Sequence, residues 1–261
     1  MTRMITRLAP TPSGFLHAGN AVNALLTSWL AREHGLVLAL RIDDMDAPPY
    51  RPDYVEDALG VLEWLGIDWS AGPHSLAEFE QSYSLRQRTD YYRSELARAQ
   101  EAGLEVYACR CTRASSTAAG VRGCAGGCRT AGHSPDDGES ALRAHLGPEI
   151  DDPILWRRDD LPAYHLASVI EDRDLGTTHV VRGEDLREST RIQVALARYL
   201  DATGFARATF LHHPLVVGND GSKLSKSQLT GGPIARDDAE REAIMGRAVH
   251  MAALLGIDGG A

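Results

Sequence analysis

The chain has 261 residues, and its hydrophobic content of 43% and charged content of 24% are ordinary for a soluble globular protein. The length suits a nucleotide-binding α/β domain with one insertion, although one large domain would also fit. A formal net charge of -9 gives no overall basic surface for nucleic acid, but a local basic strip can lie on an acidic body.

No targeting or membrane segment is evident in the chain. The N-terminal residues MTRMITRLAPTPSG contain no apolar signal region, and no apolar run approaches the ~20 residues that span a bilayer. We therefore expect a cytoplasmic protein without membrane contact.

The first hundred residues have the pattern of a parallel α/β fold. The predicted elements, in chain order, are a strand at 4–8, a helix at about 20–34 ended by Gly35, a buried strand at 36–42, and helices at about 52–65 and 85–102. Ligands of such sheets bind at the carboxyl ends of the strands. The loops APTPSGFLHAGN and DDMD lie at two such ends.

The composition changes between Glu105 and about Pro148, where Cys, Gly, Ser and Ala dominate and the hydrophobic periodicity is weak. With so few large apolar residues, this stretch predicts a small insertion held by a metal ion. The α/β pattern resumes near Ile154. It predicts a helix at 164–171, a strand at 179–183, a helix at 188–203, a strand at 212–218 and, after the loop NDGSKLSKS, a helical tail.

The loop between the first strand and the first helix, Thr11 to Asn20, suits phosphate binding. A helix N-terminus with small residues offers free N–H groups and the positive end of the helix dipole. His17 can donate hydrogen bonds to triphosphate oxygens, and Gly19 permits a close approach of the nucleotide. The alternative is a glycine-containing turn with an incidental histidine.

A second cluster of candidate residues lies in Lys223-Leu224-Ser225-Lys226-Ser227, after Asn219-Asp220-Gly221. Two lysines on a loop that begins with glycine suit the stabilisation of a polyphosphate leaving group. A solvated basic loop is the alternative. Together, the two motifs at two strand ends are far more specific than either one.

HAGN (His17 to Asn20) is similar to the HIGH signature of class I aminoacyl-tRNA synthetases, and KLSKS is similar to their KMSKS signature. RLAPTPSGFLHAGN, LALRIDDMD, LPAYHLASVIEDRDLGTTHVVRGEDL and HHPLVVGNDGSKLSKS resemble the glutamyl-tRNA synthetase family, in order, over most of Arg7 to Ser227. The resemblance implies an α/β fold, a Rossmann-like parallel sheet with a small zinc-bearing insertion and a short helical tail. The implied divisions are two halves of the catalytic domain at 1–104 and 151–230, an insertion at 105–150 and a tail at 231–261.

Little sequence follows Ser227, so no anticodon-binding domain is expected. The chain therefore looks most like the truncated form of the family, the glutamyl-queuosine tRNA(Asp) synthetases, which attach glutamate to a modified tRNA base. This implies activation of glutamate with ATP and Mg²⁺ and transfer to tRNA. We also expect a monomer. Two alternatives stay open: a paralogue that adenylates glutamate or a related amino acid for a non-tRNA acceptor, and a degenerate, non-catalytic binding protein.

The resemblance also implies roles for individual residues. Those implied to bind the amino acid are Arg7, Ala9, Thr11, Asp43, Tyr164 and Arg182. Arg182 would pair with the substrate side-chain carboxylate, as a guanidinium does in a bidentate fork. The residues implied to bind ATP or act in catalysis are His17, Gly19, Asn20, Lys223 and Lys226. Without the resemblance, Arg182 would be read as a surface ion pair and Tyr164 as a core aromatic.

All four cysteines form two close pairs, Cys109 with Cys111 and Cys124 with Cys128. Such pairs suit a tetrahedral zinc site with four thiolates. Buried free thiols and a redox pair are the alternatives. The truncated relatives have a zinc site here whose third ligand is commonly Tyr, and Cys124 stands in that place. The implied zinc is structural, because four protein ligands leave no open position.

Three departures from the family pattern affect substrate expectations. Asp43 replaces the glutamate that recognises the α-amino group, which shortens the side chain by one methylene. Ser168 stands where an Asn is frequent in glutamyl enzymes. The stretch between Ala141 and Trp156 is short, and we expect little room there for the strand pair that helps to hold the tRNA acceptor end.

Overall fold

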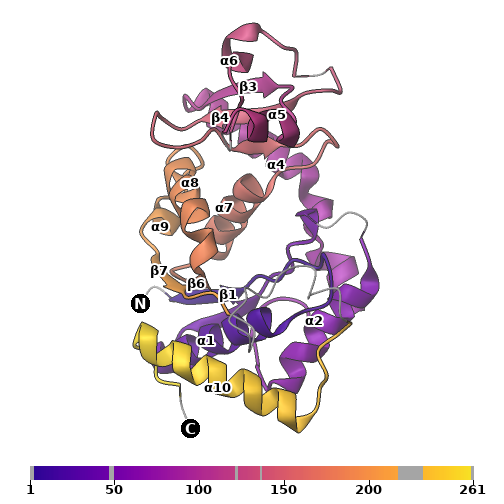
Figure 1. The fold of residues 1–261 in the computed structure, drawn as a ribbon, viewed down its shortest axis with the longest axis vertical. Helices are drawn as coiled ribbons and strands as arrows, with labels where there is room; N and C mark the ends of the chain where they lie inside the picture. The colour runs from indigo at the N-terminus through magenta and orange to yellow at the C-terminus, as the bar shows by residue number, and fades with distance from the viewer. Residues whose placement is uncertain (1–2, 47–49, 121–122, 136, 217–231, 260–261) are drawn as a thin grey trace. The chain divides into compact units, whose positions relative to one another are not determined.

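The computed structural model describes residues 3–46, 50–120, 123–135, 137–216 and 232–259 (Figure 1). The chain divides into two compact units, each made of separate segments. The first unit comprises Met1–Arg86, Leu175–Arg187 and Ala208–Ala261, and the second comprises Gln87–Asp174 and Glu188–Arg207. Among the helices of these described ranges, none is long and apolar enough to cross a membrane.

The first unit contains a parallel sheet in the order β2-β1-β6-β7. Its strands are β1 (Ile5–Leu8), β2 (Val37–Leu40), β6 (His179–Gly183) and β7 (Thr209–His213). The chain leaves β1 toward β2 on one side and leaves β6 toward β7 on the other, so the strand order reverses between β1 and β6. Such a reversal opens a ligand-binding crevice at the carboxyl ends of the strands.

Three long helices complete this unit: α1 (Ala18–His34), α2 (Pro52–Trp64) and α10 (Asp238–Leu255). Ala21, Leu25, Trp29 and Leu30 of α1 are buried, and the helix ends at Gly35, whose φ of 61° suits glycine. Pro52 begins α2, where its missing N–H costs nothing. Figure 1 shows α10 running along α1, and both helices contribute to one apolar core.

The second unit contains an antiparallel sheet in the order β3-β4-β5 and most of the remaining helices. Its strands are β3 (Glu105–Cys109), β4 (Ala141–His145) and β5 (Ile154–Trp156). Its helices are α4 (Thr89–Glu101), α5 (Arg113–Ala118), α6 (Cys128–Ala131), α7 (Tyr164–Leu175), α8 (Arg187–Ala197) and α9 (Thr203–Ala206). Short turns of helix join the larger elements at η1 (Asp44–Asp46), α3 (Leu76–Glu78), η2 (Phe79–Tyr83), η3 (Leu85–Arg88) and η4 (Glu184–Leu186).

Two predicted elements differ from the structure. The strand predicted at 212–218 is wrong in position, because β7 ends at His213 and Pro214 has no N–H to continue the ladder. The helix predicted at 188–203 ends at Ala197, and Asp201 turns the chain with a φ of 50°.

The stretch expected to have little room for a strand pair does form one. β4 and β5 are antiparallel neighbours, and Gly147, with a φ of 115°, lies in the turn between them. Asp152 holds this turn: its carboxylate accepts a hydrogen bond from the Tyr107 hydroxyl at 2.6 Å and lies 3.0 Å from Nδ1 of His145. A short turn with such contacts is enough to reverse the chain.

Candidate active site and metal centre

His17 caps the N-terminus of α1. Its Nδ1 accepts a hydrogen bond from the Gly19 N–H at 3.1 Å, and Asn20 Oδ1 accepts one from the His17 N–H at 3.1 Å. Burial lowers the pKa of His17, which favours the neutral ring. Because Nδ1 is an acceptor, the hydrogen of that neutral ring lies on Nε2. His17 can therefore offer one N–H donor to a ligand while it caps the helix.

Gly19 allows this arrangement because a larger residue would collide with the cap. A Cβ at this position would lie 2.9 Å from Cε1 of His17 and 3.8 Å from Cβ of Val216. Val216 is the last residue described before the segment that contains Lys223 and Lys226, and both lysines lie outside the described residues. The chain thus enters the KLSKS segment from a point beside the N-terminus of α1.

Backbone hydrogen bonds join the loops that follow β1 and β2. The Arg41 N–H donates to the Leu8 carbonyl at 2.9 Å, and the Asp43 N–H donates to the Pro10 carbonyl at 2.9 Å. The Asp43 carboxylate is buried and forms a double ion pair with Arg41, with Nε–Oδ1 2.5 Å and Nη2–Oδ2 3.0 Å. The motif RIDD therefore contains its own counter-ion, which the sequence reasoning missed.

Two buried arginines lie on the strands that flank the reversal of strand order. Arg7 on β1 is 6% exposed and Arg182 on β6 is 4% exposed. A guanidinium can bind a carboxylate in a bidentate fork, so two such groups on neighbouring strands suit a site for anions. Ala9 and Thr11 follow β1 at its carboxyl end and are partly exposed.

His212 is a further residue at this edge that the sequence reasoning did not single out. It lies opposite Arg182 in the register of β6 and β7, and the Arg182 guanidinium also lies 5.5 Å from the centre of the Phe210 ring. Burial, together with the charges of Arg187 and Arg182, lowers the pKa of His212. The ring is therefore neutral near pH 7. The signal in the sequence that could have pointed to His212 is the pair of histidines directly before Pro214.

Tyr164 and Ser168 belong to the second unit, where both lie on α7. Tyr164 is the first residue of the helix, and Ser168 follows one turn later with 3% exposure. The fully buried Gln193 of α8 donates a hydrogen bond from Nε2 to Ser168 Oγ at 2.5 Å. The Ser168 side chain, which departs from the family pattern, is therefore held in place by Gln193. The sequence reasoning did not predict this contact.

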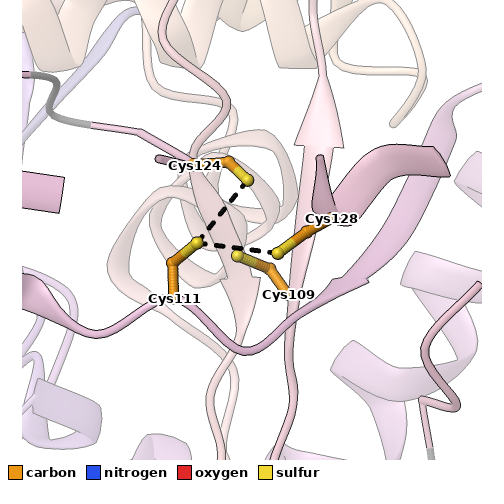
Figure 2. A group of neighbouring side chains, drawn as sticks. All are labelled: Cys109, Cys111, Cys124 and Cys128. Atoms are coloured by element: carbon orange, nitrogen blue, oxygen red, sulfur yellow. Dashed lines mark hydrogen bonds between the residues drawn. The ribbon is translucent and has the colours of Figure 1, made fainter. Parts of the chain in front are cut away.

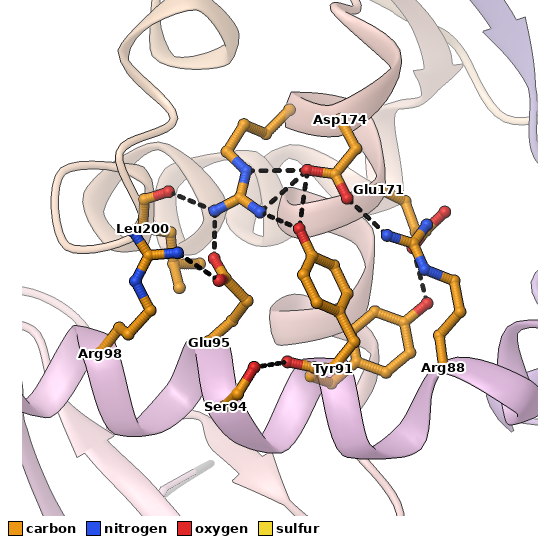
Figure 3. A network of polar contacts seen from close by, with 10 residues as sticks. Arg88, Tyr91, Ser94, Glu95, Arg98, Glu171, Asp174 and Leu200 are labelled. Atoms are coloured by element: carbon orange, nitrogen blue, oxygen red, sulfur yellow. Dashed lines mark hydrogen bonds and ion pairs between the residues drawn. The ribbon is translucent and has the colours of Figure 1, made fainter.

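An ion-pair network holds α7 against α4 within the second unit (Figure 3). Arg88, at the start of α4, pairs with Glu171 and Asp174 at 2.5 Å each. Arg173 donates to the Tyr91 hydroxyl at 2.6 Å and pairs with Asp174 at 2.8 Å. Because the carboxylates lie on α7 and most partners lie on α4, the network fixes the orientation of the helix that begins with the predicted aromatic residue.

The four cysteine side chains converge in the second unit (Figure 2). All four sulfur atoms lie within 4.8 Å of one another, with Cys111–Cys124 at 3.7 Å and Cys111–Cys128 at 3.5 Å. A tetrahedral zinc site with Zn–S bonds of about 2.3 Å has sulfur–sulfur edges of about 3.8 Å. The donor set and its spacing therefore fit a zinc ion with four thiolate ligands.

Local structure explains this convergence. Cys109 ends β3, Cys128 begins α6, and positive φ values at Gly126 and Gly127 turn the chain between the second pair. Burial raises the pKa of Cys109 to about 12. Burial also acts to raise the pKa of Cys124, but N–H groups and neighbouring thiols outweigh it and lower that pKa to about 7. A metal ion would displace the remaining thiol protons on binding.

Comparison with known proteins gives consistent matches. The family model for the catalytic domain of the class I tRNA synthetases (E and Q) matches residues 3–115 and 140–251. The unmatched stretch between them contains Cys124 and Cys128. A glutamyl-Q tRNA(Asp) synthetase of Symbiobacterium thermophilum is 35% identical over 95% of this chain and 86% of its own length. One of Pseudomonas entomophila is 37% identical over 91% of this chain and 81% of its own length.

Longer relatives are matched over about half their length. A glutamate–tRNA ligase of Nitratidesulfovibrio vulgaris is 32% identical over 87% of this chain and 52% of its own. The crystal structure of a glutamate-tRNA synthetase from Elizabethkingia anophelis has a TM-score of 0.67 and 25% identity, covering 88% of this chain and 54% of that one. A methionyl-tRNA synthetase of Mycobacterium tuberculosis, at 12% identity and a TM-score of 0.60, shares the fold. By sequence and fold, this chain belongs to the class I tRNA synthetase family of the glutamate and glutamine type.

Proposed function

We propose that this protein activates glutamate with ATP and transfers the glutamyl group to tRNA, as the names of its glutamyl-Q tRNA(Asp) synthetase relatives indicate for them. The observation that carries the proposal is the reversal of strand order between β1 and β6, with a buried arginine on each of these strands. Parallel sheets bind ligands at such a reversal. Two buried guanidiniums there favour a ligand with more than one carboxylate, such as glutamate.

In this proposal, Arg182 pairs with the side-chain carboxylate of glutamate. Asp43 attracts the α-amino group. Its ion pair with Arg41 fixes the orientation of its carboxylate, and each carboxylate oxygen can accept more than one hydrogen bond. The remaining residues proposed to contact the amino acid are Arg7, Ala9, Thr11 and Tyr164.

ATP is proposed to place its phosphates at the N-terminus of α1. The Nε2–H of His17 and the first N–H groups of the helix would donate to phosphate oxygens, and Asn20 would keep the cap in place. Lys223 and Lys226 would stabilise the pyrophosphate. They are the two lysines of the printed sequence, in which every other long basic side chain is arginine. A compact ammonium on a flexible stem suits contact with a moving polyphosphate.

The proposed chemistry has two steps. A glutamate α-carboxylate oxygen attacks the α-phosphorus of ATP, the bond to the bridging oxygen breaks, and pyrophosphate leaves with the electron pair. A tRNA hydroxyl then attacks the carbonyl carbon of the adenylate, AMP leaves, and the hydroxyl proton passes to solvent. Bound Mg²⁺ would supply charge neutralisation on the phosphates. The residues named above would act by positioning and charge stabilisation.

Cys109, Cys111, Cys124 and Cys128 are proposed to hold a structural zinc ion, which would crosslink an insertion at residues 105–150. The support is the close approach of the four sulfur atoms, which lie within 4.8 Å of one another. Four protein ligands leave no open position, so the ion would stabilise structure and take no part in the reaction.

ATP–pyrophosphate exchange, measured with each amino acid in turn and with or without total tRNA, tests the proposal. We expect exchange with glutamate in the absence of tRNA, followed by glutamylation of tRNA(Asp). Exchange without charging of any tRNA would instead favour a non-tRNA acceptor, which the net charge of -9 makes the second candidate. No exchange under any condition would contradict the enzymatic proposal.

A further inference from the structure

A buried carboxylate lies next to the proposed phosphate site. Asp57 on α2 is 5% exposed, and its Oδ2 accepts a hydrogen bond from the Leu16 N–H at 2.8 Å. Leu16 directly precedes His17, so this bond fixes the peptide that leads into the helix cap. The same bond brings a negative charge close to a site where the proposed ligand is a polyanion.

The charge of Asp57 is neutralised by a residue from the other end of the chain. Arg236 Nη2 donates to Asp57 Oδ1 at 2.9 Å. Arg236 precedes α10, which packs against α1 in the shared apolar core. Gly60, one turn after Asp57 on α2, leaves space for the guanidinium, because a Cβ there would lie 2.6 Å from Arg236 Nη1.

We infer that Arg236 is a positioning residue for ATP binding: it cancels the charge of Asp57 and so allows the loop at Leu16 and His17 to accept phosphate. The inference rests on the proposed function for the location of ATP. It gives Arg236 a part in nucleotide binding, although Arg236 is not proposed to contact the reacting atoms. Two like charges separated by a few ångströms at a protein surface repel strongly enough to change affinity by about tenfold or more.

Equilibrium binding of ATP, measured by titration calorimetry without amino acid, tests the inference through three variants. Arg236→Ala leaves the Asp57 charge uncompensated, and we expect ATP to bind about tenfold more weakly. Asp57→Asn keeps an acceptor for the Leu16 N–H without the negative charge and leaves Arg236 positive, so we expect ATP to bind at least as tightly as to the wild type. The double variant should bind ATP more tightly than Arg236→Ala alone, because the uncompensated charge is gone.

A purely structural role predicts the opposite order, since the double variant would lose both partners of a contact. The inference is overturned if the double variant binds ATP no better than Arg236→Ala, or if Arg236→Ala binds ATP as the wild type does. Arg241→Ala, an exposed change on the same tail, is the matched control and should leave affinity unchanged. Wild-type protein that binds ATP but shows no exchange would contradict the proposed function and leave this comparison valid.

Gly60→Ala gives a second test that deletes no charge. Alanine is more favourable than glycine in the interior of a helix, so the substitution should not unfold α2. Its Cβ would displace the Arg236 guanidinium, and ATP affinity should fall toward that of Arg236→Ala. Gly246→Ala in α10, where a Cβ would meet nothing within 4 Å, is the control. Equal ATP affinity in the two glycine variants would count against the inference.

Discussion

His17 combines two functions that substitutions can separate. Its ring caps α1 through Nδ1, and Nε2 carries the hydrogen proposed for ATP. Loss of an N-cap side chain costs about 1 kcal/mol of folding free energy, whereas Asn is itself a good N-cap residue. One side chain can therefore replace the cap without replacing the proposed catalytic donor.

We predict that His17→Ala lowers the free energy of unfolding by about 1 kcal/mol, while His17→Asn stays within about 0.5 kcal/mol of wild type. Both variants should lose exchange activity by about a hundredfold, as expected when one preorganised donor is removed. Urea unfolding and ATP–pyrophosphate exchange measure the two effects. Retention of full activity in the well-folded His17→Asn variant would argue against the role of the ring in catalysis.

Single residues were predictable from the sequence where a motif is local. HAGN lies within one turn of helix, so the motif alone places His17, Gly19 and Asn20 at the start of α1, but the cap that His17 forms was not predicted. The partners of Asp43 and Ser168 were not predictable in the same way. Arg41 was visible beside Asp43, but their pairing depends on burial, and Gln193 reaches Ser168 across 25 residues. The same limit applies to Asp57 and Arg236, which are 179 residues apart.

At the scale of elements, the loop that contains the four cysteines, residues 109–128, has almost no apolar core apart from its sulfur atoms. The buried cluster there consists of Tyr107, Cys109 and Cys128, with the other two cysteines packed against it. Short segments with so little apolar surface depend on a crosslink or a metal ion for stable structure. We therefore expect a metal ion held by the four cysteines to determine whether this loop is ordered.

We predict one zinc per chain by elemental analysis and a sharp rise in amide exchange across residues 109–128 when zinc is chelated. Exchange in β1 and α1 should change little, because their core lies in the other unit. Cys124→Ser should reduce bound zinc. Ser116→Ala, which removes a hydrogen bond from the same loop to the Gly123 carbonyl, should retain it. Full zinc content in Cys124→Ser would exclude Cys124 as a ligand.

Elements with strong end signals were predicted well, and those that depend on pairing partners were not. Gly35 and Pro52 fixed the expected end of α1 and start of α2. The position of β7 depends on its register with β6, so the apolar run after Pro214 was misleading. The β4–β5 pair was missed because its support comes from a carboxylate in the turn and from a strand earlier in the chain.

At the scale of the whole molecule, the distribution of lysine offers a direct probe of the proposed phosphate site. Lys223 and Lys226 are the two lysines of the printed sequence, so an amine-reactive acetylating ester has these two side-chain amines and the N-terminal amine as its amine targets. We predict that ATP with Mg²⁺ slows acetylation of both lysines, because contact with the bound phosphates would shield their amino groups from the reagent. Intact-mass and peptide mass spectrometry give the rates, and the N-terminal amine serves as the internal control. Equal lysine rates with and without ATP would contradict the predicted contact.

The order of the strands also affects how the protein folds during synthesis. The Ile5 N–H donates to Thr178 Oγ1 across 173 residues, so β1 meets its second neighbour only after the residues between them have been made. At common translation rates this takes roughly ten to thirty seconds. Throughout that time the nascent chain presents an open strand edge, a known template for aggregation. We expect ribosome-bound chains that stop before β6 to require chaperones, and the nucleotide site to be the last part of the enzyme to mature.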